Sequence, residues 1–244
     1  MRNLTKTIII GTALMVVPVT VMNANDIYIQ QVGDTLDLDI VQDGQNNSIG
    51  TSPGMGNQDA ILGSAGNASD NMTFSITQTG NQNKITAQIL GSTYTGTWTF
   101  TGDNNEVDLL CSSTAAANCG NVTLNIAATG DNQDYTINIG ETTDAGSATI
   151  NFTITDDDNI ITTDVNGTSA DITVVIDGST SLETIDSTLD IDVTGNGDLN
   201  GHTINFDATG RGHTIKFDQS GVYDNTIDLT TSGDNQNINI TQSD

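Results

Sequence analysis

Two histidines are the first candidates for chemistry, because imidazole is the side chain that proteins use most for metal binding and acid–base catalysis. His202 and His213 open two consecutive units of eleven residues, which begin His-Thr-Ile-Asn-Phe-Asp and His-Thr-Ile-Lys-Phe-Asp. If each unit forms half of a coil, the two histidines lie on opposite sides of a stack, too far apart to share one ion. Repetition explains the pair more simply than chemistry does, and no other spacing pairs a nucleophile with a base. We therefore expect no enzyme, no catalytic residue and no metal centre.

Two acidic segments carry the hard oxygen ligands that Ca²⁺ prefers. They are Asp156-Asp157-Asp158-Asn159 and Gly195-Asn196-Gly197-Asp198-Leu199-Asn200. Neither matches a defined calcium loop, and solvated turns are the simpler interpretation. We expect no cofactor, with weak Ca²⁺ binding by the acidic surface as a whole.

The two cysteines, Cys111 and Cys119, are separated by seven residues. A reactive thiol would need a base, and no histidine lies nearby in the sequence. A metal site would need more ligands than one pair supplies. In a secreted chain, a single disulfide that closes a loop is the favoured interpretation.

Charge and the N-terminal segment bound the location and partners. Residues 1–24 resemble a secretory signal peptide, with Arg2 and Lys6 before an apolar run that is too short to span a bilayer. The chain has a net charge of −26, which excludes nucleic acid as a ligand and favours cations or basic partners. We expect a secreted, extracellular or cell-surface protein with no stable membrane insertion once the signal is removed.

Apolar and polar residues alternate in runs of five to seven from residue 26 onward, which is the pattern of half-buried strands. Glycine with Asp or Asn separates the runs, as expected of tight turns. Glycines recur every eleven residues, so one strand and one turn form a unit, and two units form a coil of about 22 residues. The sequence predicts an all-β fold, a β-solenoid of stacked coils over residues 25–244, with insertions near 51–70, 111–120, 140–147 and 179–188.

One run of this alternation places Thr93, Thr95, Thr97, Thr99 and Thr101 on the same side of a strand. Rows of outward threonines occur on ice-binding solenoids. Threonine is also an ordinary strand residue, so both interpretations remain open.

The turns resemble those of curlin repeats, the units of curli amyloid fibres on bacterial surfaces. In that pattern glutamine lies two places before a turn glycine and asparagine three places after it, as in Gln78-Thr79-Gly80-Asn81-Gln82-Asn83. The resemblance implies inward amides that form hydrogen-bonded ladders along the stack, although local turn hydrogen bonds remain the alternative for the asparagines. The residues expected in these ladders and turns are Gln31, Gly33, Gln42, Gly44, Asn47, Gln78, Gly80, Asn83, Gly102, Asn105, Gly130, Gln219, Gly221, Gly233 and Gln242.

The resemblance implies a structural role. We expect a subunit or accessory component of a curli-like extracellular fibre or surface appendage, which acts in adhesion or a biofilm matrix. Its partners would be copies of itself, with factors that secrete the subunit or nucleate the fibre. The alternative is a monomeric secreted β-solenoid that binds a glycan, a cation or an ice surface.

Overall fold

All regular elements of the described residues are β-strands. The computed structural model describes residues 26–27, 29–31, 36–44, 46–50, 60–63, 72–90, 93–111, 120–140, 145–155, 158–178, 187–194, 201–220 and 225–243. None of these residues belongs to a helix that could cross a membrane. The expected signal peptide, residues 1–24, lies outside them.

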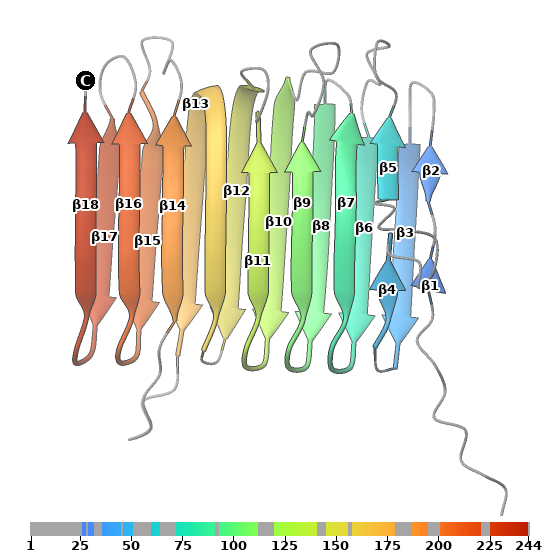
Figure 1. The fold of residues 1–244 in the computed structure, drawn as a ribbon, viewed down its shortest axis with the longest axis horizontal. Helices are drawn as coiled ribbons and strands as arrows, with labels where there is room; N and C mark the ends of the chain where they lie inside the picture. The colour runs from blue at the N-terminus through green and yellow to red at the C-terminus, as the bar shows by residue number, and fades with distance from the viewer. Residues whose placement is uncertain are drawn as a thin grey trace, which may run out of the picture.

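The strands form two sheets that face each other (Figure 1). We call them sheet A and sheet B. Sheet A contains β1 (Asp26–Ile27), β2 (Gln30–Gln31), β4 (Ser48–Ile49), β5 (Ala60–Gly63), β7 (Lys84–Leu90), β9 (Glu106–Cys111), β11 (Asp134–Ile139), β14 (Thr188–Thr194), β16 (Thr214–Ser220) and β18 (Asn237–Ser243). Sheet B contains β3 (Leu36–Asp43), β6 (Met72–Thr79), β8 (Thr93–Thr101), β10 (Asn121–Thr129), β12 (Ala145–Thr155), β15 (Thr203–Thr209) and β17 (Thr226–Ser232). The long strand β13 (Ile160–Asp177) bends from sheet A into sheet B and pairs in both.

Every strand pairing among the described residues is parallel and in register, and successive rungs of one sheet come from successive coils of the chain. Asn83 and Asn105 occupy equivalent positions 22 residues apart, which is the repeat that the sequence predicts. Other equivalent pairs are 23, 26, 28, 32 or 36 residues apart. The chain is therefore a β-solenoid whose coils vary in length, and the predicted fold class is confirmed.

The extra residues of the longer coils lie in connections between strands, which leaves the stack intact. Most of the four expected insertions fall outside the described residues. One difference concerns 51–70, because Ala60–Gly63 form β5, which pairs with β2 and β7 and so completes a rung of sheet A. A further long connection separates β14 from β15, since Asp190 and Lys216 in adjacent rungs are 26 residues apart.

The core is the single layer between the sheets. Along each interior strand, alternate side chains point inward and are almost fully buried, as in Val122, Leu124, Ile126 and Ala128 of β10. Aromatic rings meet across this layer, and Tyr135 of sheet A contacts both Phe100 and Phe152 of sheet B. Each fully buried Ile or Phe contributes about 1.5 to 3 kcal/mol relative to an exposed one.

Tight arcs of four residues connect sheet B to sheet A along the lower edge of Figure 1. Backbone hydrogen bonds continue around them, because Gly80 N donates to Thr101 O of the next rung at 2.8 Å and Gly102 N donates to Thr129 O at 2.9 Å. The first and third arc residues have positive φ, for example 118° at Gly102 and 58° at Asn104. Gly102 is also required for space, since a Cβ there would lie 2.6 Å from Gly80 O.

Candidate functional site

The two histidines do not form a site together. His202 precedes β15 and His213 follows it, so the strand separates them, and both side chains are completely buried. The backbone N–H of Ala170 donates to His202 Nδ1 at 3.1 Å, which requires a neutral imidazole protonated on Nε2. Nε2 of His213 lies 3.3 Å from the carbonyl oxygen of Thr209, the last residue of β15 before the arc. Both rings are therefore packed in the interior of the solenoid.

No group of three or more His, Cys, Asp or Glu side chains suited to a metal ion occurs within the described residues. The acidic segments proposed for Ca²⁺ lie largely outside them, as residues 156–157 and 195–200 are not described. Asp158 is an exposed arc residue with a φ of 57°. It takes the left-handed conformation that the third residue of the other arcs adopts.

The last residue of each arc points inward and builds a polar column along the stack. Asn47 Nδ2 donates to Asn83 Oδ1 at 3.0 Å, Asn83 Nδ2 donates to Asn105 Oδ1 at 2.9 Å, and Asn105 Nδ2 donates to Gln133 Oε1 at 2.9 Å. Asn83 also donates to Gly80 O within its own arc. The column therefore combines the ladder with the local turn bonds that the sequence left as alternatives.

The same column continues with residues that the sequence analysis missed. The backbone N–H of Gln133 donates to Asn159 Oδ1 at 3.2 Å, and that of Asn159 donates to Ser187 Oγ at 3.3 Å. His213 takes the equivalent position in its arc, and Gln236 does so in the last arc. For Gln133, His213 and Gln236 the signal was the position three places after a turn glycine, whereas Asn159 and Ser187 have Asp156 and Thr184 at the place of that glycine and so lacked it.

The inward glutamines behave in two ways. Gln78 Nε2 donates to Gln42 Oε1 at 2.7 Å, as in a ladder. Gln219 and Gln242 are also in register, but Gln219 Nε2 donates to His202 O and Gln242 Nε2 donates to Asn225 O at 2.7 Å. These two amides thus donate to the backbone carbonyls that precede β15 and β17 of sheet B and not to each other.

The remaining expected residues are placed as follows. Gly44, Gly80, Gly102, Gly130 and Gly233 each begin an arc with positive φ. Gln31 lies in β2, whereas Gly33 and Gly221 lie outside the described residues. Cys111 is buried and disulfide-bonded, and Cys119 lies outside the described residues.

Surface charges are arranged in columns as well. Each Lys or Arg of the described residues pairs with an acid one rung away, as in Lys84–Glu106 at 2.5 Å and Lys216–Asp190 at 2.8 Å, with Arg211–Asp234 at 3.4 Å. Desolvation and then the neighbouring carboxylate of Asp218 raise the pKa of Asp192 above its usual value. Outward acids of adjacent rungs therefore repel each other where no cation lies between them.

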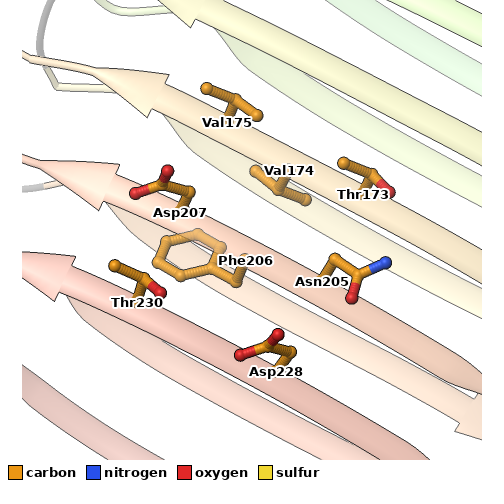
Figure 2. A pocket seen from close by; sticks show the side chains of 8 residues that line it. All are labelled: Thr173, Val174, Val175, Asn205, Phe206, Asp207, Asp228 and Thr230. Atoms are coloured by element: carbon orange, nitrogen blue, oxygen red, sulfur yellow. The ribbon is translucent and has the colours of Figure 1, made fainter.

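A shallow depression of about 210 Å³ lies on sheet B across β13, β15 and β17 (Figure 2). Its lining side chains are Thr173, Val174, Val175, Asn205, Phe206, Asp207, Asp228 and Thr230. The lining has two carboxylates and two threonine hydroxyls, but it has no imidazole, amine or guanidinium group beside them, so it matches no catalytic constellation. We assign it no reaction.

The two ends of the stack are open in the part of the chain that the structure describes. The last rung of sheet A, β18, is exposed throughout, with exposed fractions of 39% for Ile238 and 45% for Ile240, whereas Ile215 in the preceding rung is 1% exposed. At the other end, Ile27, Ile29 and Leu38 are only partly buried. An unpaired in-register edge above an apolar layer is a template for a further strand, and it is the principal candidate for a functional surface.

Comparisons with known proteins do not identify the chain. No family model matches it, no curated protein matches it in sequence, and no solved structure matches it in fold.

Proposed function

We propose that this protein is a secreted structural protein, a subunit of a curli-like extracellular fibre that grows by stacking of coils. The observation that supports it best is the pair of open ends, where no described residue covers the two parallel edges or the apolar layer between the sheets. Solvation of exposed Ile238 and Ile240 is unfavourable, and a further rung would bury both side chains.

The interior of the stack supports the same proposal. The polar column from Asn47 to Gln133 repeats one hydrogen bond from rung to rung: the side-chain nitrogen of each rung donates to the side-chain oxygen of the next. Each rung therefore offers the same donor and the same acceptor to its neighbours. Stacking of subunits would extend this arrangement without a new kind of contact. The curlin-like turn motif agrees with this role.

The experiment is to incubate the purified protein at high concentration and follow it by size-exclusion chromatography and negative-stain microscopy. We expect filaments for the wild type and a persistent monomer for Ile240→Lys, because a charge would be buried at the open end. The matched control is Ile160→Lys, since Ile160 is also 45% exposed but points outward from the middle of sheet A. A wild-type protein that remains monomeric for days would contradict the fibre function.

A second candidate function has its own observation, an uncharged area on the outer face of sheet B. We call it the threonine field: sixteen outward residues of β6, β8, β10 and β12, which are exposed or half-buried. They are Thr73, Ser75, Thr77, Thr79, Thr95, Thr97, Thr99, Thr101, Thr123, Asn125, Ala127, Thr129, Thr149, Asn151, Thr153 and Thr155. Threonine therefore occupies twelve of the sixteen positions, and no position carries a charge.

The geometry of this field favours a flat, repetitive ligand such as ice. Strands about 4.8 Å apart and side chains about 6.6 Å apart along each strand form a regular grid of hydroxyl and methyl groups. The aromatic residues Tyr94, Trp98 and Phe100 point inward and are buried, so none of them can stack on a sugar ring. A field of roughly 500 Å² is also smaller than the ~800 Å² per partner of a standard protein interface.

The test measures the shape of ice crystals grown in a solution of the monomeric protein and the thermal hysteresis of that solution. Thr97→Lys, in the middle of the field, should reduce both effects several-fold, and Thr162→Lys on the exposed face of sheet A should leave them unchanged. Equal behaviour of the two variants, or a wild type without any effect on ice, would exclude this second function.

A further inference from the structure

The two open ends of the stack carry matching residues in matching columns. In-register pairs run through sheet A from Ile27 by way of Ile49 and Ile85 to Ile215 and Ile238. Counted in the same way, the positions of Ile29 and Gln31 fall in the columns of Ile240 and Gln242. The first and last rungs of sheet A therefore have Ile, Ile and Gln at the same three register positions.

Sheet B has a similar correspondence. Its columns run from β3 to β17 and place Leu38 with Ile227, Ile40 with Leu229 and Gln42 with Thr231. Branched aliphatic side chains of similar volume thus lie at both ends of the two central columns, so one end can pack on the other without a large cavity.

The arcs at the two ends also agree in backbone conformation. The first residues, Gly44 and Gly233, have φ values of 141° and 139°, and the third residues, Asn46 and Asn235, have φ values of 58° and 61°. The arcs are therefore able to stack as interior arcs do, with backbone hydrogen bonds from one arc to the next.

We propose that copies of this protein join head to tail, with β18 of one copy on β1 and β2 of the next and β17 on β3, in the register of these columns. The inference rests on the proposed fibre function and specifies its partner, a second copy, and its polarity. A head-to-tail contact is heterologous and does not close, so it generates a filament. It also keeps every strand parallel, as in the rest of the stack, whereas a contact between two tails would reverse the strand direction.

The test uses two single-cysteine additions on the outward face, Asp39→Cys and Asp228→Cys, which lie in one column. Residues opposite each other in adjacent rungs lie within the Cα separation that a disulfide accepts, about 4.4 to 6.8 Å. With a mild oxidant, a mixture of the two variants should form covalent dimers, and each variant alone should form none. Thr123→Cys, on the same face in an interior strand, is the control for random collisions.

The outcomes separate the two proposals. Filaments without cross-links in the mixture would overturn the proposed register while the fibre function holds. Cross-links in Asp228→Cys alone would show a tail-to-tail contact and overturn the polarity. A wild-type protein that forms no filaments would overturn the fibre function, and the junction with it.

Discussion

The side-chain nitrogen of Asn83 donates to Oδ1 of Asn105 at 2.9 Å, although the two residues are 22 positions apart in the sequence. Both side chains are completely buried, so neither can exchange this bond for one to water. The bond therefore fixes the register of adjacent arcs, because a shift by one residue would leave buried amide groups without partners.

Replacement of Asn105 by alanine should lower the free energy of unfolding by about 1 to 3 kcal/mol, since its partners Asn83 and Gln133 would lose hydrogen bonds in a buried column. Urea unfolding followed by circular dichroism measures the change. Asn138→Ala is the control, because Asn138 is half-buried on the outer face of β11 and should change stability by less than about 0.5 kcal/mol. Equal losses in both variants would contradict a structural role of the column.

Gly102→Ala should destabilise the protein by about 1 to 3 kcal/mol. The residue has a φ of 118°, and the added methyl group would meet the carbonyl oxygen of Gly80 at 2.6 Å. Thr101→Ala changes the neighbouring exposed residue and serves as the control in the same unfolding measurement. A fully stable Gly102→Ala protein would show that the arcs can relax away from one another.

Through protonation of Asp192, the free energy of unfolding should rise as the pH is lowered from about 7 toward about 4. Desolvation and then the charge of Asp218 raise the pKa of Asp192 in the folded chain. The folded chain therefore binds this proton more tightly than the unfolded chain does. The resulting stabilisation is present at low pH and is lost as the pH rises through the raised pKa. Asp192→Asn should therefore raise the melting temperature at neutral pH and weaken its pH dependence, by an amount equivalent to about 0.2 to 1 kcal/mol. A steeper pH dependence in this variant would contradict the assignment.

Reduction of the disulfide of Cys111 should lower the free energy of unfolding by about 2 to 3 kcal/mol, as expected for closure of a short loop. The measurement is thermal unfolding with and without reductant. The double variant Cys111→Ser and Cys119→Ser is the control, and reductant should have no effect on it. A reductant effect that persists in this variant would point to a cause other than the disulfide.

Asp228→Asn should accelerate filament growth and reduce its dependence on salt. The proposed junction places Asp228 of one copy in the column of Asp39 of the next, closer than the screening length of about 8 Å at physiological ionic strength. Thioflavin fluorescence across a salt series measures the rates. Asp171→Asn, on the same face in an interior rung, should have a smaller effect.

Much of this fold could be predicted from the alternation of side chains and the turn glycines. The inward positions of Ile204 and Phe206, and the arc at Gly210, follow from a period of two that ends at a residue with positive φ. The hydrogen bond between the side-chain amides of Gln78 and Gln42 follows from the position of glutamine relative to the turn.

Other features depend on register between distant coils, which the sequence does not state. Gln219 lies two places before a glycine, as Gln78 does. Its side-chain nitrogen nevertheless donates to the backbone carbonyl of His202, the residue before β15. The polar column changes along its length for the same reason, because Ser187 takes the place of an amide after a long connection. Which residues face each other there depends on the length of each connection.

Each described strand contacts the neighbouring rungs of its own sheet and the side chains of the sheet that faces it, so no contact among these residues links the two ends of the stack. A pulling force on the C-terminus would peel β18 from β16 first and then remove one strand after another, with a separate event for each rung. The mechanical strength of such a filament would be set by its weakest single rung, whatever its length.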